Sequence, residues 1–198
     1  MTRGSTLPAH RLPHLTGRLP IPAQARTSQA PLPGPSLDAF NTAGVEETLS
    51  ALLGCLHSLC WARRVAEHRP YPTLDALLAA SDEAAYDLTP EDLTEALAGE
   101  PLPALPEDAY EAAHMALGAA HAAYTARFGY TFVICLDGVP PAETLDHVLE
   151  GIRSRLTNDP EDERVVAAEE LRRLARQRLA GFLRGTAPLP RHGSAAGA

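Results

Sequence analysis

Residues 158–183 read NDPEDERVVAAEELRRLARQRLAGFL, and this stretch decides the fold class. Asp159 and Pro160 stand where the cap and the first residue of a helix are expected, and acidic residues fill the first turn. Apolar residues then recur at helical spacing. They are Val165, Ala168, Leu171, Leu174, Leu179 and Leu183. The stretch therefore predicts one long helix.

The same start and stop signals recur upstream, in LTPEDLTEALAG at residues 88–99. Thr89 is placed as an N-cap, Pro90 as the first helical residue, and Gly99 lies at the far end. No alternating strand pattern competes with the helical ones. The sequence predicts an all-α fold, a single bundle of seven to nine helices with short loops. The other helices are expected at 38–55 with a break at Gly44, 58–67, 73–86, 107–127 and 141–156.

One short passage between two of these helices is not helical. It is RFGYTFVICLDG, residues 127–138, in which Gly129 ends the preceding helix. The residues after Gly129 are aromatic or β-branched, which favours extended backbone, so we expect a short extended loop at 130–136. With no sheet to pair with, its backbone N–H and C=O groups remain available to a ligand. Alternatively, the passage is a buried crossover whose side chains fill the core.

The two ends of the chain differ in composition from its middle. Residues 1–35 are rich in Pro, Ala, Arg and Ser, and no acidic residue precedes Asp38, so they cannot build a core. We expect 1–35 to be a disordered tail, with a targeting peptide as the less favoured alternative. Residues 185–198 are expected to be a flexible C-terminal tail. The folded domain is then 36–184.

Composition narrows the function classes. The chain has 198 residues, enough for one domain, with a formal net charge of −8. All 17 basic residues are arginine, and this acidic balance argues against binding to nucleic acid. The three cysteines form neither a disulfide framework nor a zinc motif, which favours a reducing compartment. No apolar run reaches the roughly 18 residues that span a bilayer, so we expect a soluble, cytoplasmic protein without membrane partners.

Three segments together resemble the OHCU decarboxylase family. FGYTFVICLDG at 128–138 resembles the family's FGFPFVI motif and its later glycine. Residues 40–98 follow the family's opening, including the helix that holds Trp61 and the Arg69-Pro70-aromatic turn. Residues 148–179 resemble the family's closing pattern of ERL, Asn, Asp-Pro, Glu and LRL. The order and spacing of the three segments make the resemblance specific.

The resemblance implies a reaction and a mode of action. Enzymes of this family decarboxylate 2-oxo-4-hydroxy-4-carboxy-5-ureidoimidazoline to (S)-allantoin at the end of urate degradation. They are all-α and usually dimeric. Because the carbanion left by CO2 loss is delocalised into the substrate ring, they need neither a metal nor an organic cofactor. The resemblance therefore implies a cofactor-independent carboxy-lyase, a small ureidoimidazoline substrate and a homodimer.

The resemblance also implies site residues. Phe132, Val133 and Ile134 correspond to the loop that lines the family's substrate pocket, where backbone amides bind the ring. Arg178, in LARQRL, corresponds to the family's catalytic arginine. The planar fork of a guanidinium suits a carboxylate or a ureido group.

The sequence departs from the family where the catalytic histidine is expected. The family has a His-Pro pair after the helix that matches residues 91–99, and here Glu100-Pro101 stands in that place. By its distance from the next helix, Glu100 could instead match a later glutamate of the family, with the histidine deleted. No histidine lies there on either alignment, so Glu100 becomes the candidate catalytic acid. His121 replaces the family's asparagine ahead of Tyr124.

Two functions follow from these residues. The first is the decarboxylation itself, with Glu100 and Arg178 as catalytic residues. The second is a catalytically inactive paralogue that binds or scaffolds a partner in the same pathway. If the pocket survives, Glu100 should reach Arg178 or the backbone of 132–134, and otherwise it should face solvent. A metal is not expected, because His114 and His121 lie two helical turns apart.

Overall fold

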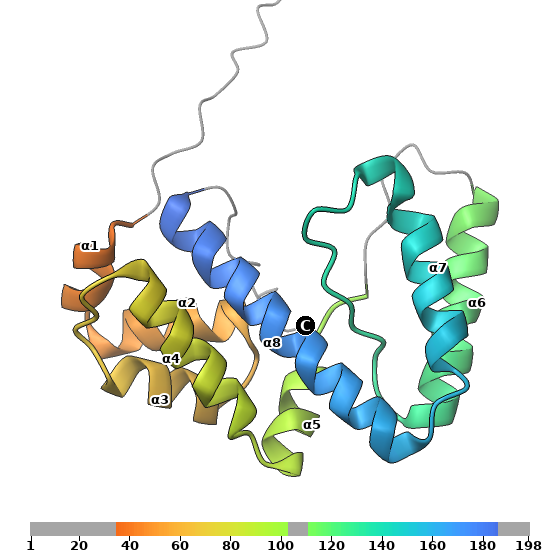
Figure 1. The fold of residues 1–198 in the computed structure, drawn as a ribbon, viewed down its shortest axis with the longest axis horizontal. Coiled ribbons are helices and arrows are strands. Elements are labelled where there is room, and N and C mark those ends of the chain that lie inside the picture. Colours follow the sequence, from red (N-terminus) through yellow and green to blue (C-terminus); the bar gives the residue numbers. More distant parts are fainter. Residues whose placement is uncertain (1–34, 103–110, 186–198) are drawn as a thin grey trace, which may run out of the picture. The chain divides into compact units, whose positions relative to one another are not determined.

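The computed structural model describes residues 35–102 and 111–185 (Figure 1). The tails predicted at 1–35 and 185–198 therefore lie almost wholly outside the described residues. Within them the chain forms eight α-helices, one short 3-10 helix and no strand, which confirms the all-α prediction. The helices are α1 (Leu37–Thr42), α2 (Val45–Cys55), α3 (Leu59–Glu67), α4 (Leu74–Tyr86), α5 (Pro90–Ala98), α6 (Glu111–Phe128), η1 (Pro141–Glu143), α7 (Thr144–Arg155) and α8 (Pro160–Arg184).

The predicted caps set the helix boundaries. The Thr89 side chain accepts the Asp92 N–H, and the Asp92 carboxylate accepts the Thr89 N–H, so α5 begins with a full capping box. Asp159 caps α8, which continues to a left-handed Gly185. The expected break at Gly44 separates α1 from α2. These ends follow from local side-chain chemistry, which explains why the sequence predicted them.

The long helix α8 packs against α2, α4 and α5. Its buried residues Ala167, Leu171, Ala175 and Leu179 recur every four positions and join the first hydrophobic cluster, which also contains the fully buried Trp61. Val165, predicted to be part of the apolar face, is 70% exposed. It lies two residues away from this row, about 200° around the helix, so the prediction for Val165 is wrong.

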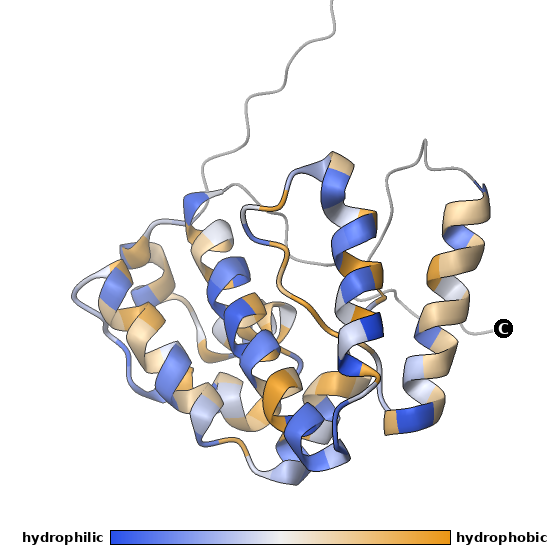
Figure 2. Cartoon of the chain, turned by 45° about the vertical axis from the view of Figure 1, so that its right-hand side comes forward, coloured by the Kyte–Doolittle hydropathy of each residue, from blue (hydrophilic) through white to orange (hydrophobic). Residues whose placement is uncertain are grey.

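The segment 131–136, which is neither helix nor strand, contributes to two hydrophobic clusters. Much of it is coloured as hydrophobic in Figure 2. Phe132 belongs to the second cluster, formed mainly by α6 and α7, whereas Val133 belongs to the first cluster. Neighbouring residues of extended backbone point to opposite sides, so one segment serves both clusters. Phe132 and Ile134 lie so close to Gly151 of α7 that a Cβ there would come within 3.1–3.2 Å of them.

The segment follows a position that suits only glycine. Gly129 has a φ of +82°, a left-handed conformation that strains other residues, and it ends α6 directly after Phe128. The predicted helix stop is thereby confirmed.

Among the described helices, none is both long enough and apolar enough to cross a membrane.

Candidate functional site

Glu100 and Arg178 form a two-pronged ion pair. Glu100 directly follows Gly99, the C-cap of α5, and Arg178 lies on α8. The two guanidinium nitrogens of Arg178 donate to the two carboxylate oxygens of Glu100 at 2.8 and 2.7 Å. The Glu100 side chain is 3% exposed and that of Arg178 is 25% exposed. The structure thus brings the two predicted catalytic residues together, and their catalytic roles stay predictions.

A third element meets this pair. Arg178 Nη1 also donates to the carbonyl of Cys55, the last residue of α2, at 3.1 Å. Helix-terminal carbonyls lack a partner within their helix, so the guanidinium satisfies one of them. Burial works to lower the pKa of Arg178, but the hydrogen bonds and charge of Glu100 outweigh it, and the pKa is raised. Arg178 therefore stays cationic where α2, α5 and α8 meet.

Cys55 beside Arg178 is not a nucleophile. Its side chain is buried, and burial raises the pKa of the thiol to about 12, although the charge of Arg178 works in the opposite direction. The reactive form of a cysteine is the thiolate. At neutral pH Cys55 is a protonated core residue.

The predicted substrate-binding residues lie deeper than a pocket wall. Phe132 and Val133 are buried, and Ile134 is half-buried. The side chains of Phe132 and Val133 thus match the buried-crossover alternative. No hydrogen bond among the described residues joins 132–134 to Glu100 or Arg178. The next residue, Cys135, lies near enough to contribute to the raised pKa of Arg178.

The backbone of this segment is only partly free. The Cys135 N–H donates to the Glu170 carboxylate on α8 at 2.7 Å, so the prediction that the backbone donors remain available is wrong for Cys135. The Val133 carbonyl accepts from Arg155 Nη1 of α7 at 2.7 Å. Side chains, in place of a neighbouring strand, satisfy these groups.

A buried polar network, not anticipated from the sequence, lies behind the segment. Glu163 is 0% exposed and accepts hydrogen bonds from Tyr124, Arg155 and Asn158. Burial and the bond to Glu163 raise the pKa of Tyr124, so its hydroxyl stays protonated and donates. The Arg155 guanidinium also lies 4.6 Å from the centre of the Phe132 ring. The network thus anchors α6, α7, α8 and the segment to one carboxylate.

The sequence did carry one signal for this network. Glu163 precedes Ala167 by four residues and Leu171 by eight, so it continues the buried row of α8. Arg155 likewise follows Val148 and Ile152 on the buried side of α7. A charged residue in phase with a core face indicates a buried partner of opposite charge.

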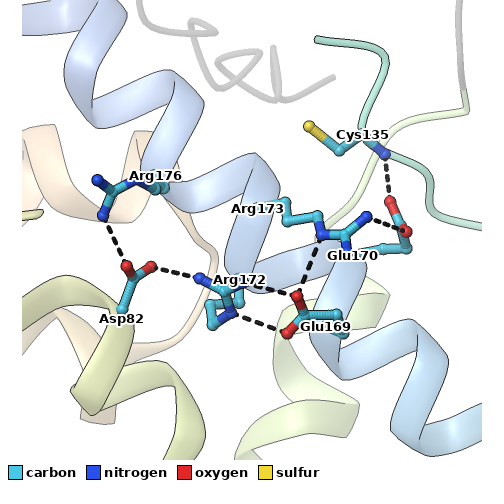
Figure 3. Close-up of polar contacts among 7 residues, drawn as sticks. All are labelled: Asp82, Cys135, Glu169, Glu170, Arg172, Arg173 and Arg176. Carbon is cyan, nitrogen blue, oxygen red and sulfur yellow. Dashed lines mark hydrogen bonds and ion pairs between the residues drawn. The ribbon is translucent and has the colours of Figure 1, made fainter. Parts of the chain in front are cut away.

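A second polar cluster joins α4 to α8 on another face (Figure 3). Asp82 accepts from Arg172 at 2.9 Å and from Arg176 at 2.6 Å. A cavity of about 740 Å³ opens beside them, lined in part by Cys135 and by Arg173. Arg176 and Arg178 project about 200° apart around the helix. The cavity therefore lies on a different face of α8 from the Glu100–Arg178 pair.

Metal ligands do not gather in the part of the chain that the structure describes. Within 35–102 and 111–185, no group of three or more His, Cys, Asp or Glu side chains could hold a metal ion.

His121 gives the protein an expected sensitivity to acid. It is 4% exposed, neither ring nitrogen has a hydrogen-bond partner among the described residues, and burial lowers its pKa. Below about pH 6.5, the ordinary pKa of histidine, the unfolded chain therefore binds a proton more readily than the folded one. The protein loses stability as the pH falls through this range. The Tm of each protein is measured at pH 8 and at pH 5.5. The drop in Tm should be about 3 °C smaller in His121→Leu than in the unmutated protein, which corresponds to roughly 1 kcal/mol of unfolding free energy.

The control for this measurement is His147→Leu, because His147 is exposed on α7. It should retain the full pH dependence. Equal pH dependence in His121→Leu and the unmutated protein would contradict the assignment.

Comparisons with known proteins agree with the helical arrangement. Residues 41–109 and 102–180 match the family model for OHCU decarboxylase. A crystal structure of (S)-allantoin synthase matches with a TM-score of 0.60 and 20% identity over 75% of this chain, which spans about half, 54%, of that one. A crystal structure of OHCU decarboxylase in the presence of (S)-allantoin matches with a TM-score of 0.59 and 21% identity, over 71% of this chain and 99% of that one. No curated protein matches the sequence. At these identities the two structures establish the fold alone.

Proposed function

Because the chain belongs to the OHCU decarboxylase family, we propose that it decarboxylates 2-oxo-4-hydroxy-4-carboxy-5-ureidoimidazoline to (S)-allantoin in urate degradation. The observation that carries the proposal is the Glu100–Arg178 pair, a cation and an acid held together in a largely buried place. By the same resemblance we propose that the enzyme is a cytoplasmic homodimer that uses no metal or organic cofactor.

Arg178 supplies the anion-binding group of this mechanism. Its fork already holds one carboxylate in two-pronged geometry, so it can hold the substrate carboxylate in the same way or donate to the oxygen of the ureido group. To bind there, the substrate displaces Glu100 from at least one guanidinium nitrogen. Cleavage of the carbon–carboxylate bond releases CO2 and leaves its electron pair in the ring. The fixed positive charge of Arg178 stabilises the negative charge that remains.

Glu100 supplies the proton in this mechanism. Two carboxylates crowded at one guanidinium repel each other, which favours a proton on one of them. The displaced Glu100 takes that proton from solvent and delivers it to one face of the carbanion. The new C–H bond is then formed on a single face, and the product is one-handed. Ile134 is proposed to contact the ring through its backbone.

One observation favours the alternative function, an inactive paralogue. The guanidinium of Arg178 is already satisfied by Glu100 and by the Cys55 carbonyl, so the same pair also has the chemistry of a purely structural bridge. A protein of this kind would keep the fold as a binding or scaffold partner in the pathway.

An activity assay separates the two functions. Substrate is generated from urate with uricase and hydroxyisourate hydrolase, and allantoin is followed by circular dichroism. We expect faster conversion than in the uncatalysed reaction, with (S)-allantoin as product. Glu100→Gln should retain binding and slow turnover by about 10²–10⁴-fold, the effect of a lost acid–base group. Racemic product at the uncatalysed rate from the unmutated protein would refute decarboxylation and leave the scaffold function.

A further inference from the structure

Two polar contacts flank the Ile134 peptide along the chain. Arg155 binds the Val133 carbonyl, and Glu170 binds the Cys135 N–H, each at 2.7 Å (Figure 3 shows the second contact). In extended backbone, the N–H and C=O of alternate residues point to the same edge and those of the residue between point to the opposite edge. The backbone groups of Ile134 therefore face away from both contacts. Among the described residues, the Ile134 N–H donates to no partner.

Both contacting side chains are themselves held in place. Arg155 donates to the buried Glu163 at 2.8 and 2.5 Å. Glu170 is largely buried and also accepts from Arg173 at 3.4 Å. A side chain with a fixed conformation loses little entropy when it holds a further group. These anchors therefore fix the position of the segment and do not merely follow it.

Glu170 also fixes the segment relative to Arg178. The two residues lie eight positions apart on α8, or about 12 Å along a rigid helix. The contact from Glu170 to Cys135 thus sets how far the Ile134 peptide lies from the guanidinium. Catalytic groups lose activity steeply when they are displaced by about 1 Å.

We propose that Glu170 is a positioning residue, which holds the Cys135 amide so that the free edge of the Ile134 peptide faces the substrate bound at Arg178. The proposal rests on the function proposed above. Arg155 acts with Glu170 from the other end of the same peptide, through the Val133 carbonyl.

The kinetic test compares three variants. Glu170→Ala should lower kcat/KM at least about tenfold, mainly by raising KM, and should lower the enantiomeric purity of the allantoin. Glu170→Gln should stay within about threefold of the unmutated protein, because its amide oxygen still accepts the Cys135 N–H. Glu169→Ala is the matched control, since Glu169 also binds Arg173 but not the segment. If Glu170→Ala behaves like Glu169→Ala, the proposal is overturned.

A second readout works without activity. Alkylation of Cys135 by iodoacetamide, followed by peptide mass spectrometry, reports whether the segment is held. Measured well below the Tm of each variant, alkylation should be at least about fivefold faster in Glu170→Ala than in Glu170→Gln, which also removes the charge that helps raise the pKa of the Cys135 thiol but keeps the contact. Glu169→Ala should be alkylated at the unmutated rate. If the unmutated protein has no decarboxylase activity, the proposed function fails. The alkylation experiment still decides in that case whether Glu170 holds the segment. An alkylation rate in Glu170→Ala no faster than in Glu170→Gln overturns the proposal whatever the activity.

Discussion

Replacing Arg178 with alanine is expected to abolish measurable decarboxylation. The variant loses the cation that binds the substrate anion and stabilises the charge left by CO2. Removal of one such group typically costs about 10²–10³-fold in turnover, and here binding is lost as well. Allantoin should then form at the uncatalysed rate and as a racemate, as followed by circular dichroism.

Two controls separate chemistry from folding in this experiment. Arg176→Ala removes another arginine of α8 that binds Asp82 and not Glu100, so it should keep activity within about threefold. Arg178→Ala leaves the Glu100 carboxylate buried without its partner, which destabilises the fold. The double variant with Glu100→Ala removes this unpaired charge and should regain stability without activity. Catalysis by Arg178→Ala at the unmutated rate would refute the assigned role.

The largest expected loss of stability comes from Glu163→Ala. Glu163 is fully buried and is the counter-charge of Arg155, which has only about a tenth of its side chain exposed. Breaking a buried ion pair from one side costs about 3–5 kcal/mol, because the remaining charge stays buried. In a domain of this size the Tm should fall by about 10 °C or more. Thermal unfolding followed by far-UV circular dichroism measures the change.

The matched control is Asp162→Ala, because Asp162 precedes Glu163 in the first turn of α8 but is exposed. Its loss should cost less than about 1 kcal/mol, the value of an acid near a helix N-terminus. Replacing both partners with apolar residues, as Arg155→Met with Glu163→Leu, should recover much of the lost stability. A Glu163→Ala variant as stable as Asp162→Ala would contradict the assignment.

Local chemistry explains why the helices could be predicted. Thr89, Asp159 and Gly129 each act on backbone within a few residues of themselves, through a cap or a left-handed φ. The helical spacing of apolar residues similarly needs no knowledge of the partner helix. The all-α class and most helix boundaries therefore followed from the sequence alone.

Contacts between distant residues explain what was missed. Val165 and Glu163 lie in the same turn region of α8, yet the apolar residue is exposed and the acid is buried. Residue type predicts the opposite. Only the positions of Arg155, Tyr124 and Asn158 make burial of the acid favourable, since they satisfy its oxygens.

For the candidate site, too, local sequence and tertiary contacts determined different things. The sequence by itself determined the residue types at Glu100 and Arg178, and the resemblance assigned them roles. Only the tertiary structure decided that these residues, 78 positions apart, bind each other, and that Glu170 and Arg155 bind the backbone of the segment. The physical reason is range: caps and periodicity act within a few turns, whereas ion pairs and buried hydrogen bonds depend on how the helices pack.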